Sequence, residues 1–102
     1  MNAAHTPGPW KVETAQRGFV IAATHIDYDM AVVRDVGNEN NEANAHLIAA
    51  APDLLEAAKL VVAWYEAEDD HSKADFRQRM QMCRDSEDAL RSAIAKATGG
   101  AA

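Results

Sequence analysis

Three arginines in the last third of the chain, spaced seven residues apart, are the residues best suited to binding a ligand. Arg77, Arg84 and Arg91 share one side of a helix, because seven residues make nearly two turns. Two interpretations fit this stripe. It is either a solvated flank with ion pairs to Glu87 and Asp88, as most surface arginines are, or an anion-binding rim at a subunit interface. The second predicts a phosphate-bearing ligand, since guanidinium groups donate paired hydrogen bonds to phosphate.

Two tryptophans could stack on a base beside such an anion. Trp10 follows two prolines and is interpreted first as a core anchor that covers one end of a sheet, and second as a stacking residue. Trp64 and Leu60 lie on the flank of a long helical segment, where an exposed apolar patch favours association. With Arg84 as the main candidate, the predicted ligand-binding residues are Arg77, Arg84, Arg91, Trp10, Trp64 and Asn44.

Other chemistry is poorly supported by the residue pattern. The histidines His5, His25, His46 and His71 match no zinc-ligand spacing, and Cys83 is the only cysteine, on an apolar helical stripe where a buried inert thiol is expected. We therefore expect no metal site, no cofactor and no enzymatic activity. A small hydrolase that uses scattered histidines and acids is kept as an alternative.

Composition limits the class of protein. A chain of 102 residues is expected to form one domain with a modest core, and its apolar content of 48% is typical of a globular protein. The net charge of −6 argues against DNA as a partner. One cysteine, no signal peptide and no membrane-length apolar run lead us to expect a soluble protein of the bacterial host cytoplasm. Alanine-rich helices offer little area to a core, which favours a homo-oligomer.

The elements that must position these residues form a single α+β domain over residues 1–102. An N-terminal arm of residues 1–9 precedes strand-like segments at 10–13, 19–24 and 30–36, which predict a three-stranded antiparallel meander over 10–36. A helical region then covers residues 42–97, and residues 98–102, in which Gly99 suits a left-handed cap, form a frayed tail.

Pro52 breaks the helical region near Ala50 and Ala51, because proline has no amide hydrogen and suits the first turn of a new helix. The second segment is expected to run to about Glu68. Ser72, with Asp75 three residues on, is expected to cap a last helix from Lys73 to Ala97. The two long helices should form an antiparallel hairpin.

Apolar residues at three- and four-residue steps predict the face that each helix buries. For the central helices this predicted core stripe is Leu47, Ile48, Ala51, Leu54, Leu55, Ala58, Val61, Val62 and Tyr65. For the last helix it is Phe76, Met80, Cys83, Leu90, Ala93, Ile94 and Ala97.

Two motifs carry a resemblance to known proteins. The segment TPGPW at 6–10, together with EANAHLIAAAPDLLEA at 42–57, resembles a widespread group of small phage and prophage proteins. A short antiparallel sheet followed by two helices is also similar in architecture to the Thoeris anti-defence sponge proteins of phages. That resemblance implies a homo-oligomer that sequesters a nucleotide-derived immune signal, such as a cyclic nucleotide or a cyclic ADP-ribose. The alternative is a protein-interaction module that inhibits a host defence factor.

Overall fold

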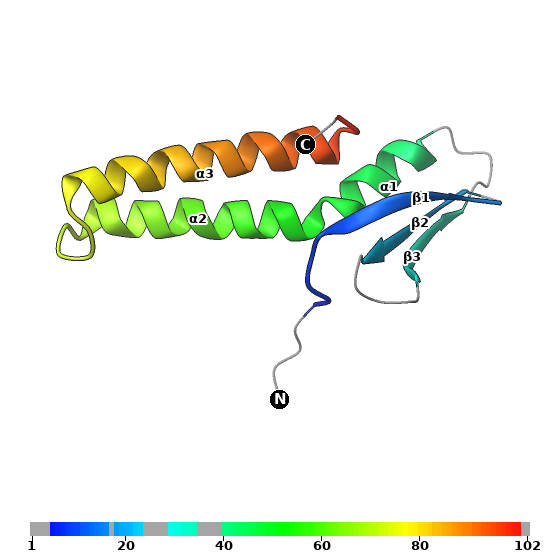
Figure 1. The fold of residues 1–102 in the computed structure, drawn as a ribbon, viewed down its shortest axis with the longest axis horizontal. Coiled ribbons are helices and arrows are strands. Elements are labelled where there is room, and N and C mark those ends of the chain that lie inside the picture. Colours follow the sequence, from blue (N-terminus) through cyan, green and yellow to red (C-terminus); the bar gives the residue numbers. More distant parts are fainter. Residues whose placement is uncertain (1–4, 17, 24–28, 35–39, 101–102) are drawn as a thin grey trace.

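The computed structural model describes residues 5–16, 18–23, 29–34 and 40–100, with the backbone alone at 29, 30, 33 and 34. Figure 1 shows a small sheet at one end of the molecule and a long helical hairpin that extends away from it. The elements, in chain order, are β1 (Trp10–Ala15), β2 (Gly18–Ala23), β3 (Asp29–Arg34), α1 (Asn41–Ala49), α2 (Ala51–Asp69) and α3 (Phe76–Ala97). The predicted α+β class, with an antiparallel meander before the helices, is confirmed.

The sheet has the strand order β1-β2-β3, and both neighbouring pairs are antiparallel. One face packs on α1, where Ile21 meets Ala45 and Ala49, and these three residues form the buried cluster of this end. Trp10, Val12, Phe19 and Ala31 pack around that cluster. Val32 is exposed, so the register that alternation left open places Ala31 toward α1. The predicted strand ends at Thr24 and Val36 lie outside the described residues.

Pro52 acts as expected. The first helix ends at Ala49, the second begins at Ala51, and Pro52 occupies the first turn of α2, where its missing amide hydrogen costs no hydrogen bond. The amide of Ala50 still donates to the carbonyl of His46, so the chain turns without an extended linker. α1 therefore packs on the sheet while α2 leaves it toward the far end of the hairpin (Figure 1).

The start of the last helix differs from the prediction. α3 begins at Phe76, and its N-cap is Asp75, whose carboxylate accepts from the amide of Gln78 at 2.8 Å. The Gln78 side chain accepts from the amide of Asp75 at 2.9 Å, which completes a capping box. Ser72 does not cap the helix, because its hydroxyl donates to Asp70 Oδ1 at 2.6 Å.

The end of α3 matches the prediction of a left-handed glycine cap. Gly99 has a φ of 83°, which glycine adopts without the steric cost that a Cβ brings. The amides of Gly99 and Gly100 donate to the carbonyls of Lys96 and Ala95, the paired bonds of a Schellman motif. A methyl group at Gly99 would stand 3.2 Å from His46 Cδ2, so this cap also packs α3 against α1.

The predicted core stripe is wrong for much of the hairpin. α2 and α3 meet through small residues, and the buried ones along this contact include Ala57, Ser86 and Ala93. Small side chains let two helix axes approach closely, so they occupy the contact in place of larger residues. The predicted core residues that are exposed instead are Leu47, Ile48, Ala51, Leu55, Ala58, Val62 and Tyr65 before the turn and Phe76, Met80 and Ile94 after it.

The shape explains this reversal. The radius of gyration is 16.8 Å, whereas a compact domain of this length has about 13 Å. The sheet packs mainly against α1 and leaves the length of the hairpin without a layer from its own chain (Figure 1). A two-helix layer can bury only the line where its helices touch, so the wider apolar stripes face outward.

Candidate ligand-binding site at the hairpin tip

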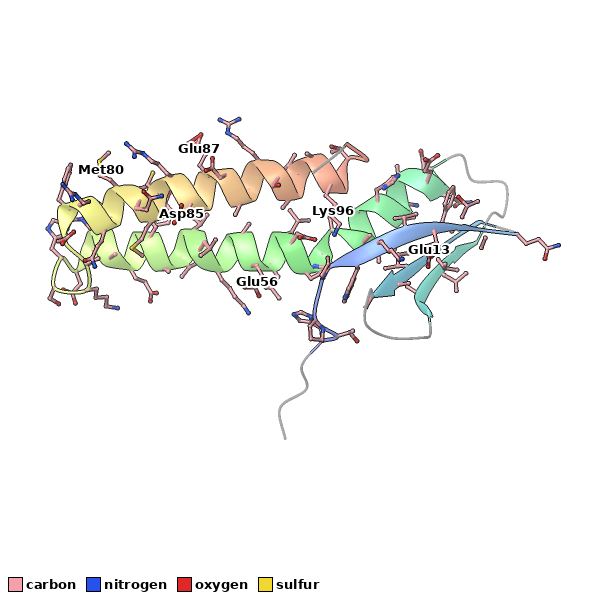
Figure 2. The ribbon with its side chains drawn as sticks, in the orientation of Figure 1. Glu13, Glu56, Met80, Asp85, Glu87 and Lys96 are labelled. Atoms are coloured by element: carbon pink, nitrogen blue, oxygen red, sulfur yellow. The ribbon has the colours of Figure 1, made fainter. Side chains whose placement is uncertain are left out.

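A hollow lies at the end of the hairpin remote from the sheet. The last turns of α2 and the first turns of α3 enclose a volume of about 320 Å³, and Figure 2 shows Met80 in this region. We call this the tip hollow. Its lining residues are Trp64, Glu68, Phe76, Arg79, Met80, Cys83 and Arg84. A neighbouring depression of about 350 Å³ shares Phe76, Met80 and Arg84 with it and adds Arg77 and Gln81.

Arg79 is a largely buried lining residue of the tip hollow. Its side chain is only 11% exposed, its Nε lies 3.2 Å from Glu68 Oε1, and its Nη1 donates to the carbonyl of Ala74 at 2.8 Å. The guanidinium also lies 5.9 Å from the centre of the Phe76 ring, a cation–π distance. These contacts join the end of α2 to the start of α3, and they leave the charges of Arg79 and Glu68 paired.

Arg77 and Arg84 differ from Arg79 in having no such partner. Within the described part of the chain neither forms a salt bridge or a side-chain hydrogen bond, and both are exposed. Arg91, the third arginine of the stripe, instead holds Glu87 Oε2 at 2.9 Å through its Nη2. As far as the described residues show, two unpaired cations therefore lie beside the tip hollow, and the third arginine is paired with Glu87.

Trp64 provides an aromatic wall. It is half-buried, and its ring centre lies 4.9 Å from that of Tyr65 with the planes tilted by 38°. The ring lines the tip hollow together with Arg84, although twenty residues separate them in the sequence. The antiparallel packing of α2 on α3 brings them together.

The structure thus gathers three of the six predicted ligand-binding residues, Trp64, Arg84 and Arg77, around one end of the hairpin. Trp10 lies in β1 and packs on the sheet cluster, and its Nε1 donates to the carbonyl of Thr6 at 3.0 Å, as the core-anchor interpretation requires. Asn44 is an exposed residue of α1, at the sheet end of the molecule (Figure 1). Within this single chain Trp10 and Asn44 lie away from Arg77 and Arg84, and Arg91 is paired with Glu87, so their part in a shared site stays a prediction.

Phe76 and Met80 are lining residues that the sequence pattern concealed. Both were assigned to the buried stripe of the last helix, yet they are 68% and 41% exposed. Their position one turn apart beside Arg77 and Arg84 is visible in the sequence. The pattern alone does not tell a core side chain from the wall of a hollow.

A larger hollow of about 510 Å³ lies at the other end of the hairpin, between the arm at Pro7, Gly8 and Pro9 and the helices. Its one cation from α3, Lys96, is bound to Asp53 Oδ2 at 2.8 Å, and Glu56 adds a further carboxylate to the lining. This charge balance disfavours a phosphate. We therefore take the tip hollow as the candidate site for the predicted type of ligand.

The described residues provide neither a metal centre nor a membrane span. Within these ranges no three histidine, cysteine or acidic side chains gather where they could hold a metal ion. Likewise, no described helix has both the length and the apolar character needed to cross a membrane.

Comparison with known proteins places the chain in a family. No curated protein and no solved structure matches it. A family model described as Salmonella phage P22 protein Y8K6 matches residues 1–101, which is nearly the whole chain. The chain therefore belongs to this family of phage proteins.

Proposed function

We propose that this phage protein is a non-enzymatic accessory protein that sequesters a nucleotide-derived immune signal of the host at its tip hollow. The observation that supports this proposal is that Trp64 shares the tip hollow with Arg84, while Arg77 lines the neighbouring depression beside Arg84. Among the described residues neither arginine has an acidic partner. Base stacking and phosphate binding require this pair of chemistries.

The dimensions suit such a ligand. Sites for small molecules have volumes of roughly 300 to 1,000 Å³, and the tip hollow with its neighbouring depression falls in this range. Phe76 and Met80 supply apolar walls between the aromatic ring and the arginines. The paired charges of Arg79 and Glu68 limit repulsion between that carboxylate and a phosphate.

Calorimetric titration with cyclic di- and trinucleotides and cyclic ADP-ribose isomers tests the proposal. Arg84→Ala should weaken the bound ligand about ten- to a hundredfold, since a hydrogen bond to a charged group is worth about 1.5 to 3 kcal/mol. Arg91→Ala is the matched control, because it removes the same side chain from the same helix at a position already paired with Glu87. Its affinity should equal that of the wild type.

Each alternative function predicts a different result in these experiments. No heat from any of these ligands would reject sequestration of this class of signal and favour the protein-interaction module. Recovery of a chemically altered ligand after incubation would instead identify a hydrolase. Equal losses of affinity in Arg84→Ala and Arg91→Ala would mean that the ligand contacts the stripe elsewhere than the tip hollow.

A further inference from the structure

The two sides of the α2–α3 hairpin differ in polarity. One side carries the salt bridge in which Lys96 reaches from α3 to Asp53 at the start of α2, and the larger hollow beside the N-terminal arm lies there. Figure 2 labels Lys96 near the end of α3. Asp53 stands four residues before the buried Ala57, and Lys96 stands three residues after the buried Ala93. Because α2 and α3 are antiparallel, these two positions project to the same side of the line along which the helices touch.

The residues that project from the other side of this line are apolar in both helices. Tyr65 lies eight residues after Ala57, and Ile94 lies eight residues after Ser86, so an antiparallel pair projects both from one side. Val61 lies four residues after Ala57, and Leu90 lies four residues after Ser86. Both are half-buried and line the base of this side.

The large exposed apolar residues of this side and its borders form what we call the apolar face. Its members are Leu55, Val62, Tyr65, Phe76, Met80 and Ile94, each between 41% and 68% exposed. The one acidic residue of α3 that interrupts it, Glu87, is already paired with Arg91 at 2.9 Å. The face thus presents apolar area without an unpaired charge along its centre.

We propose that a second copy of this chain covers the apolar face, so that two hairpins form a four-helix bundle. Using ordinary full areas for these side chains, the six residues expose roughly 600 Å² per chain, close to the ~800 Å² per partner of a standard interface once half-buried neighbours are added. This area lies at the upper end of the apolar patches found on monomeric proteins, and such patches often mark interaction sites.

The geometry points to a copy of the chain rather than to another protein. α2 and α3 contain 19 and 22 residues, so the face follows two helices of nearly equal length. Two such layers stacked face to face bury each other along their full length, as pairs of hairpins do in four-helix bundles. A twofold axis needs a patch that matches itself, and a face that is mainly apolar along both helices meets this condition.

This inference does not depend on the proposed ligand. Phe76 and Met80 belong both to the apolar face and to the tip hollow, so the second copy would add a wall to that hollow. Ile94 lies toward the other end of α3 and lines neither depression at the tip. Substitution of Ile94 therefore tests the dimer through a residue that does not line the tip hollow of its own chain.

The experiment is the mass of the protein in solution, measured by light scattering at tens of micromolar without ligand. The wild type should have twice the 11.1 kDa of one chain. Ile94→Lys should have the mass of one chain and keep its helical circular dichroism, because its side chain is 53% exposed in the single chain. Leu60→Lys is the control. Leu60 is 43% exposed and stands three residues after Ala57, as Lys96 stands three residues after Ala93, so it projects from the polar side and its substitution should leave the dimer intact.

Ile94→Ala covers the case in which the lysine variant fails to fold. It should raise the dissociation constant of the dimer at least tenfold in a dilution series. A wild-type mass of one chain, or of more than two, would overturn the proposal. So would an Ile94→Ala dimer that dissociates at the same concentration as the wild type.

Discussion

The contact between α2 and α3 depends on the small size of Ala57, which is completely buried. Its neighbour Ala58 is exposed. Periodicity of apolar residues assigns these two alanines the other way round, with Ala58 in the core stripe. Replacing each in turn by leucine therefore separates the observed packing from the one that the sequence pattern predicts.

Ala57→Leu adds three carbon atoms at the contact of α2 with α3, where Ala57 and Ala93 are both buried. Overpacking of this kind costs about 1 to 3 kcal/mol, because the helices must separate or the new side chain must leave its rotamer. In a domain of this size each kcal/mol lowers the melting temperature by about 4 to 8 °C. Ala57→Leu should therefore melt roughly 5 to 20 °C below the wild type.

Ala58→Leu is the matched control, with the same substitution one residue along the same helix. Its new side chain projects away from the buried contact of α2 with α3, so its melting temperature should stay within a few degrees of the wild type or rise. Thermal unfolding followed by circular dichroism, with urea unfolding as a second measure, provides the comparison. Equal melting temperatures, or a larger loss in Ala58→Leu, would refute the observed contact between the helices.

Three further predictions concern the ends of α3 and the turn before it. Asp75→Ala removes the side-chain cap that accepts from the amide of Gln78 and should lower the free energy of unfolding by about 1 kcal/mol in urea titrations. Gly99→Ala should cost about 1 kcal/mol or more, because φ is 83° there, and unchanged stability would contradict the left-handed cap. Hydrogen bonds from the Ser72 hydroxyl and amide hold the pKa of Asp70 below its usual value. The stability linked to this carboxylate is therefore present at neutral pH and lost as the pH falls through that lowered pKa. Ser72→Ala should raise the pKa of Asp70, as measured by nuclear magnetic resonance titration of the carboxyl carbon.

Local chemistry made several elements predictable from the sequence alone. The break at Pro52 and the cap at Gly99 follow from the backbone preferences of single residues. Their positions in the chain therefore do not depend on tertiary packing. The three strands and the hairpin follow from short-range patterns of apolar and turn-forming residues. The start of α3 was misplaced because two residue pairs could cap it, and Asp75 with Gln78 makes both bonds of the capping box.

The candidate site was only partly predictable. Seven-residue spacing correctly placed Arg77 and Arg84 on one side of a helix, because that relation needs nothing beyond helical geometry. Whether Trp64 or Trp10 joins them depends on which distant segments the fold brings together. The register of α2 against α3 brings Trp64 to Arg84, and the packing of β1 on α1 keeps Trp10 in the sheet cluster.

The buried face of the hairpin was decided by the tertiary structure alone. A sequence pattern ranks helix faces by their apolar area and so selects Leu55, Val62 and Tyr65 as core. The folded chain buries Ala57 and Ala93 instead, because two helices pack closely where their side chains are small, and because the sheet covers only the short helix before Pro52. The sequence by itself determined that this hairpin has an apolar stripe on each helix, and the arrangement of the layers determined that both stripes face outward.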